Sequence, residues 1–125
     1  MTRLFWIAIA AVSLAACGTP GQSSHITPSA SVFAAKTAYT GALVVAVRYN
    51  QLPRCGRPAS PAICSDEVVV LQLRRADAVA GAALDGAEAI VRQPGVQDSV
   101  AIAAARSATE AVKLLQTVLT TYSVK

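Results

Sequence analysis

Charged residues are scarce in this chain of 125 residues: they make up 14% of it, against about 25% in an average protein. It has one histidine and seven carboxylates, which gives little support to acid–base catalysis by a histidine or to a metal centre. A share of 54% hydrophobic residues excludes a wholly disordered chain. The length allows one domain, and it excludes a multidomain enzyme or a doubly wound nucleotide-binding fold.

An uncharged apolar run covers residues 4–16 (LFWIAIAAVSLAA), directly after Arg3. A helix that crosses a bilayer needs roughly 20 apolar residues, so this run is too short to be one. A positive residue followed by a short apolar run is typical of a secretory signal peptide, which is removed from the mature protein. The sequence therefore predicts a signal peptide over residues 1–16.

The end of this run, residues 14–18 (LAACG), resembles the lipobox of bacterial lipoproteins. The resemblance implies cleavage before Cys17, a diacylglyceryl thioether on its sulfur and acylation of the new amine. Two or three acyl chains would anchor the protein firmly in a membrane. Gly18 is not an aspartate, which in Gram-negative lipoproteins implies the outer membrane, facing the periplasm. The alternative is an ordinary secretory signal that is cut near Ala15 or Ala16, with Cys17 as a spare thiol.

Three cysteines in an exported protein leave one thiol over. If Cys17 carries lipid, Cys55 and Cys64 form an even pair, and an envelope compartment permits disulfides. The two bracket a turn-rich segment (GRPASPAI), and a bridge would close a loop of about ten residues. The alternative, a metal site with these two ligands, is weakly supported, because the one histidine lies far away in the sequence and no carboxylate falls inside the loop. We therefore predict a Cys55–Cys64 disulfide.

Residues 17–27 are rich in Gly, Ser, Thr and Pro and predict a flexible tether, in which the lone His25 is solvated. Beyond it, three segments have apolar or small residues at steps of three and four, the spacing of one helix face. They are Val32, Ala35, Tyr39, Ala42, Ala46 and Tyr49; Val69, Leu73, Ala76, Ala80, Ala83, Ala87 and Ile90; and Ala101, Ala104, Ala108, Ala111, Leu115, Val118 and Tyr122.

These patterns predict an all-α domain over residues 28–125, with helices at about 29–51, 66–93 and 98–122. Thr27, Ser65 and Asp98 are the expected N-caps. The fold is an up-down-up three-helix bundle whose first connection is closed by the disulfide. A strand at 42–50, and a helical hairpin with the first helix detached, are the competing interpretations. Valines at 44, 45 and 47 make the first helix apolar on most sides, so we expect it to be well covered.

The connection between the first two helices carries Arg48, Arg54 and Arg57, with no acidic residue between positions 48 and 64. At 1.5 Å per residue, a helix of this length places that connection about 30 Å from the tether. The functional interpretation is a partner-binding tip for an anionic envelope component, such as peptidoglycan or an acidic protein. The alternative is a set of ordinary surface arginines. Aromatic residues are not interleaved with the basic ones, so nucleic-acid binding is not expected.

No catalytic residue, cofactor site or metal site is predicted, because phosphate loops and metal-ligand spacings are missing from the sequence. Asp85 and Glu88 are the one close carboxylate pair beyond the start of the second helix. A pocket lined by Tyr39, Tyr49 and Tyr122 is conceivable, but core packing with the hydroxyls at the surface is favoured.

The sequence thus predicts a non-catalytic, lipid-anchored envelope protein that acts as an interaction or structural module. The alternatives are a lipoprotein that binds a small ligand or a lipid between its alanine-lined helices, and a phage-type lysis lipoprotein similar to outer spanin subunits. Self-association is a further alternative, because helix faces made of alanine bury little apolar area and a second copy would bury more. The segments LPRCG and ICSDEVV resemble uncharacterised small proteobacterial proteins, which implies no activity.

Overall fold

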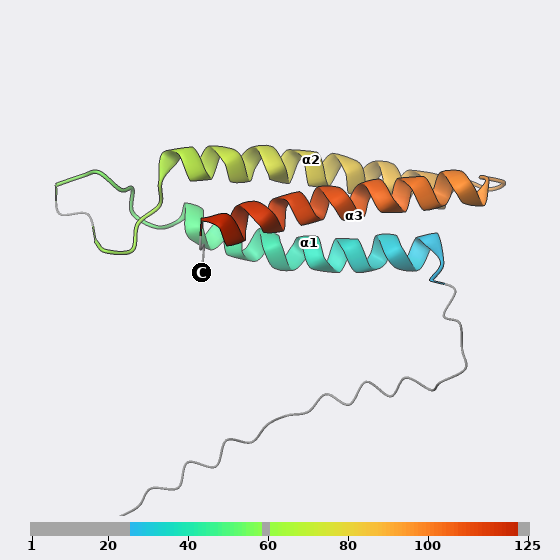
Figure 1. The fold of residues 1–125 in the computed structure, drawn as a ribbon, viewed down its shortest axis with the longest axis horizontal. Coiled ribbons are helices and arrows are strands. Elements are labelled where there is room, and N and C mark those ends of the chain that lie inside the picture. Colours follow the sequence, from blue (N-terminus) through green and yellow to red (C-terminus); the bar gives the residue numbers. More distant parts are fainter. Residues whose placement is uncertain (1–25, 59–60, 123–125) are drawn as a thin grey trace, which may run out of the picture.

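The computed structural model describes residues 26–58 and 61–122, and within them it shows a bundle of three helices (Figure 1). The helices are α1 (Pro28–Asn50), α2 (Glu67–Val91) and α3 (Asp98–Thr121). They run up, down and up, and each packs against the other two. The predicted architecture is confirmed, and the strand at 42–50 and the detached first helix are wrong. The predicted signal peptide, Cys17 and His25 lie outside the described residues.

The start of α1 follows the prediction, because the Thr27 hydroxyl oxygen accepts a hydrogen bond from the Ala30 amide at 3.2 Å. The start of α2 differs: Asp66, not Ser65, is the N-cap, and its carboxylate accepts from the amides of Val68 and Val69 at 2.8 and 3.4 Å. A carboxylate also interacts favourably with the positive end of the helix dipole.

In α3 the N-cap is Gln97, so Asp98, which the sequence suggested as the cap, is the first helical residue. Between α2 and α3 the chain turns at Gly95, whose φ of +73° is a conformation that glycine adopts without strain. This short connection keeps the two helices antiparallel.

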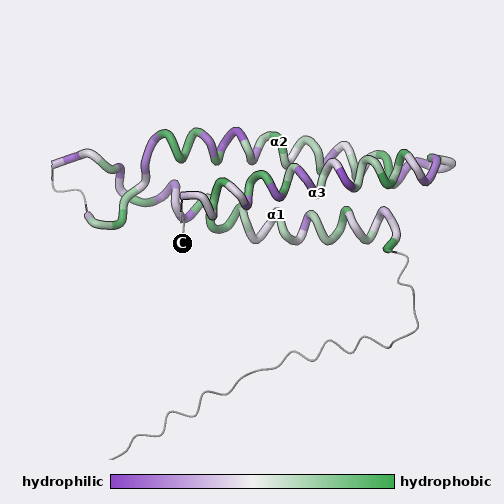
Figure 2. Tube along the Cα trace, viewed as in Figure 1, coloured by the Kyte–Doolittle hydropathy of each residue, from purple (hydrophilic) through white to green (hydrophobic). Residues whose placement is uncertain are grey.

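The core forms two clusters along the bundle. One lies toward the 92–97 turn and the start of α1; it contains Val32, Ala35, Ala80, Leu84, Ala87, Ala105, Ala108 and Val112. The other lies toward the α1–α2 connection; it contains Ala42, Ala46, Val69, Leu73, Ala76, Leu115 and Leu119. Alanine dominates the first cluster and larger side chains are more frequent in the second. Figure 2 shows that α2 and α3 are interrupted by hydrophilic segments, whereas α1 is mostly apolar between its ends.

The buried face of α3 is rotated from the predicted one. The buried residues are Ala101, Ala105, Ala108, Val112, Leu115 and Leu119. The predicted positions 104, 111 and 118 are only half-buried, and Tyr122 is 41% exposed. The reason is that α3 packs against both α1 and α2, so the centre of its face points between two neighbours. In α2, Leu84 joins the predicted face, while Ala83 and Ile90 lie at its edge.

The second half of α1 is not well covered, contrary to the expectation from its valines. Val44 and Val47 are 49% and 46% exposed, and Phe33 in the first half is 73% exposed. By length and composition alone, α1 is apolar enough to cross a membrane, and only 17% of its most apolar stretch is buried in the bundle. Core helices and signal sequences share this property. The outward face of α1 is thus an apolar surface that the rest of the described chain leaves open.

Candidate functional site

The segment that joins α1 to α2 folds back on itself and forms the tip of the bundle (Figure 1). Its two ends meet in an isolated β-bridge between Arg54 and Ser65. The Cys55 amide donates to the Ser65 carbonyl at 3.1 Å, and the Ser65 amide donates to the Pro53 carbonyl at 2.8 Å. These two bonds bring Cys55 and Cys64 next to each other.

Cys55 and Cys64 are joined by a disulfide, with their Cα atoms 5.1 Å apart. This confirms the predicted pairing, and it contradicts the alternative in which the two sulfurs hold a metal. Gly56 follows the first cysteine with a φ of +80°, which lets the chain turn outward directly after the bridge. The loop from 55 to 64 is therefore closed at its base both covalently and by backbone hydrogen bonds.

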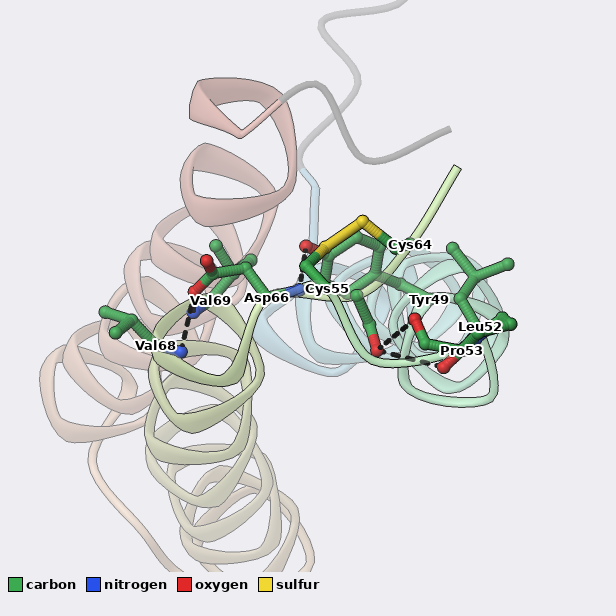
Figure 3. Close-up of a disulfide and its surroundings, with 9 residues drawn as sticks. Tyr49, Leu52, Pro53, Cys55, Cys64, Asp66, Val68 and Val69 are labelled. Atoms are coloured by element: carbon green, nitrogen blue, oxygen red, sulfur yellow. Dashed lines mark hydrogen bonds between the residues drawn. A yellow bond between two sulfur atoms is a disulfide. The ribbon is translucent and has the colours of Figure 1, made fainter. Parts of the chain in front are cut away.

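Hydrogen bonds of Ser65 and Tyr49 attach the tip to both helices. Ser65 has no exposed surface, and its hydroxyl donates to the Leu52 carbonyl at 3.0 Å. The phenol of Tyr49 reaches from α1 and accepts from the Asp66 amide at 2.9 Å (Figure 3). The sequence reasoning assigned Ser65 to a cap and Tyr49 to the helix face. Their contacts depend on how the loop folds, so spacing alone gave no signal for them.

The three arginines of the predicted tip are in different environments. Arg48 is exposed on the last turn of α1, and Arg57 is exposed in the loop. Arg54 is half-buried, and its backbone takes part in the bridge with Ser65. The structure therefore places Arg54 and Arg57 beside the disulfide and leaves Arg48 on the helix. Ile63, which the sequence analysis did not single out, is 72% exposed next to Cys64.

Tyr39 forms a second polar contact, between α1 and α2, that the sequence did not reveal. Its hydroxyl donates to the Asp77 carboxylate at 2.7 Å. This hydrogen bond, with burial and the nearby negative charges of Asp77 and Asp85, raises the pKa of Tyr39 to about 12. Tyr49 bonds elsewhere and Tyr122 is exposed, so the three tyrosines do not line a common pocket.

The raised pKa of Tyr39 predicts a loss of stability at high pH. The folded state holds this proton up to about pH 12, whereas the unfolded chain releases it near pH 10, so the free energy of unfolding falls as pH rises between these values. Tyr39→Phe should lower the free energy of unfolding by about 1 kcal/mol at pH 8. At pH 11 the difference in unfolding free energy between the variant and the wild type should be smaller. Urea unfolding at the two pH values measures this. An equal narrowing for Tyr122→Phe would contradict it.

The carboxylate pair Asp85 and Glu88 does not form an acid–base pair. Glu88 accepts hydrogen bonds from Lys36 on α1 and from Arg92, the latter at 3.2 Å. The bond from Lys36 is the main reason that the pKa of Glu88 is lowered. Among the described residues, no three His, Cys, Asp or Glu side chains come close enough to hold a metal ion.

Open grooves run along the bundle where two helices meet. One of about 100 Å³, between α1 and α2, is lined by Leu43, Val47, Leu73 and others, with Asp77 at its polar side. Another of about 230 Å³ lies between α2 and α3, beside Val79 and Leu114. Both volumes are below the roughly 300–1,000 Å³ of typical small-molecule pockets. Two open grooves between α1 and α3, of about 340 and 350 Å³, reach the lower end of that range, and Ile26 and Thr109 line both.

No family model, curated protein or solved structure matches this chain. The functional conclusions therefore come from the chain's own residues.

Proposed function

We propose that this chain is a lipid-anchored protein of the bacterial cell envelope, without a catalytic role, that acts by contact with other envelope components. The observation that carries the proposal is the motif at residues 14–18, in which Cys17 stands where lipoproteins carry their lipid. The pairing of the other two cysteines supports it, because Cys55 and Cys64 are used up in a disulfide and Cys17 is left over.

The compartment follows from the same residues. A disulfide is stable outside the cytoplasm, and Gly18 in place of aspartate favours the outer membrane with the domain facing the periplasm. The tether of ten residues from 18 to 27 spans at most about 33 Å. The helical domain is therefore held close to the membrane that carries the lipid.

The contact surface in this proposal is the tip. Arg57 and Arg48 are exposed cations there, and a partner of opposite charge would be steered toward them. The carboxylates of peptidoglycan, or an acidic envelope protein, have the required charge. Asp66 and Glu67 beside the tip are exposed carboxylates and partly offset this positive charge.

Full-length protein expressed in a Gram-negative host should fractionate with the membranes and lack residues 1–16. Mass spectrometry of its N-terminal peptide should show acyl chains on Cys17. Cys17→Ser should lose the lipid and its processing, because the thiol that carries the diacylglyceryl group is gone. Cys55→Ser/Cys64→Ser is the matched control, since it removes two cysteines and should keep the lipid. A soluble product with an unmodified Cys17 thiol would overturn the proposal.

A further inference from the structure

The outward face of α1 has a composition that the other described helices do not share. Phe33, Thr37, Thr40, Val44 and Val47 follow one another at steps of four and three, and all five are exposed. They form one stripe, about 21 Å long at 1.5 Å per residue, on the side opposite the buried face. We call these five residues the α1 stripe.

The polar atoms of the α1 stripe are already satisfied by the helix itself. The Thr37 hydroxyl donates to the Phe33 carbonyl at 3.1 Å, and the Thr40 hydroxyl donates to the Lys36 carbonyl at 2.9 Å. With their hydroxyls bonded back to the helix, threonines can face an apolar environment without an unpaired donor. The stripe therefore presents mainly methyl groups and one aromatic ring.

The charges that α1 itself carries beside the α1 stripe have one sign. Between Lys36 and Arg48 the sequence has no ionisable group except the phenol of Tyr39, which bonds to Asp77 on the other side of the helix. Moreover, α1 contains no carboxylate: all seven acidic residues of the chain lie between positions 66 and 110. Glu88 of α2 offsets the charge of Lys36 through an ion pair, and Asp77 lies in the groove beside Val47. An apolar face on a helix whose own charges are all positive is still complementary to an anionic lipid surface.

The chain before α1 gives a reason why that surface should be lipid. Under the proposed function, on which this inference rests, Cys17 carries the acyl chains and lies nine positions before Ile26, so at most about 30 Å of chain separates them. Ile26 itself is 72% exposed and lies seven positions before Phe33. The α1 stripe thus starts at the end of α1 that is nearer in sequence to the proposed membrane attachment point.

We propose that α1 lies flat on the membrane, with the α1 stripe buried in the headgroup region of anionic lipids. In this orientation Arg48 faces headgroups, which leaves Arg57 as the exposed cation of the tip. The bundle then rests along the membrane rather than standing upright with its tip about 30 Å away. Helices that bind in this way insert their apolar face about 5–10 Å into the boundary between headgroups and acyl chains.

Tryptophan quenching tests this orientation on the full chain, because Trp6 is the only tryptophan in the sequence. Phe33→Trp is made in a Trp6→Phe chain and reconstituted into phosphatidylglycerol vesicles with brominated or unbrominated acyl chains. Its fluorescence should fall by about half or more with brominated lipid, as expected for a ring at that depth. The matched control is Leu114→Trp: Leu114 is 50% exposed, in the groove between α2 and α3, and should stay unquenched.

Replacing phosphatidylglycerol by phosphatidylcholine should weaken the quenching at position 33, since the cations lose their partner. Equal signals at positions 33 and 114, or no quenching at either, would overturn the inference. A tryptophan at position 33 that is shielded from water in vesicles but not quenched would also overturn it, because a second copy would then cover the stripe. Circular dichroism checks that each variant keeps its helical content.

The same samples separate this inference from the proposed function. Mass spectrometry of the Cys17 peptide reports the lipid, and vesicle flotation reports membrane attachment. A lipidated protein that floats without quenching at position 33 overturns the flat orientation alone. An unlipidated protein that is still quenched at position 33 overturns the lipoprotein proposal and supports the flat orientation.

Discussion

Leu115→Ala should lower the free energy of unfolding by about 3–5 kcal/mol, the upper part of the range for buried leucines. Leu115 is completely buried in α3, in the cluster near the α1–α2 connection. Three other members of that cluster are Ala42, Ala46 and Ala76. Alanine side chains cannot reach into the space that the leucine leaves, and helix backbones move little. The cavity therefore stays open, and the full cavity cost is added to the lost burial.

Leu114→Ala is the matched control for this prediction. Leu114 is the preceding residue of the same helix, and it is 50% exposed, so the same substitution leaves no cavity and should cost less than about 1 kcal/mol. Urea unfolding of both variants gives the two free energies, provided that the slope with denaturant stays at the wild-type value. Similar losses of unfolding free energy at positions 114 and 115 would contradict the burial of Leu115 in the core.

The sequence was sufficient to predict the three helices, because helix formation leaves local marks. These marks can be read from the sequence directly: prolines at 28 and 94, Thr27 before the first helix, and apolar residues at steps of three and four. The disulfide was also predictable, since three cysteines allow three pairings and the expected lipid on Cys17 leaves only one of them. The anchor at Cys17 was predicted from a motif and stays a prediction.

The features that were missed depend on how the helices are turned toward each other. In α3, positions 104 and 105 are both alanine. Either one can face the core, so the sequence fits two rotations of the helix about its axis equally well. Only the presence of two packing partners selects Ala105 over Ala104. The Tyr39–Asp77 bond joins residues 38 positions apart, and its existence depends on the register of α1 against α2.

The candidate site illustrates the same limit. The loop chemistry around Cys55 predicted a closed turn, but not that Arg54 would be half-buried there or that Ser65 would be fully buried. The open face of α1 was missed because valine is a residue type that is common in cores, so its presence alone does not show whether it is buried. Whether such residues are covered depends on how many neighbouring helices are available, and a bundle of three leaves one side of each helix outside.

Cys55→Ser/Cys64→Ser should lower the free energy of unfolding by about 2.7 kcal/mol, because the disulfide removes the entropy of a loop of about ten residues from the unfolded chain. For a domain of about 100 residues this corresponds to a fall in Tm of roughly 10–20 °C. Wild-type protein with a reductant should unfold at the same temperature as the double variant. Thermal unfolding followed by circular dichroism measures both.

The double variant also shows whether the tip acts through its charge or through its closed shape. Arg57→Ala keeps the disulfide and, as a substitution of an exposed side chain, should lower the Tm much less than the double variant does. If charge carries the contact, Arg57→Ala should reduce co-sedimentation with purified peptidoglycan sacculi, and added salt should reduce it further. The double variant keeps Arg57, and the bonds from Cys55 and Ser65 amides still close the base of its loop. Loss of binding in the double variant alone, below its Tm, would assign the contact to the closed loop instead of the arginine.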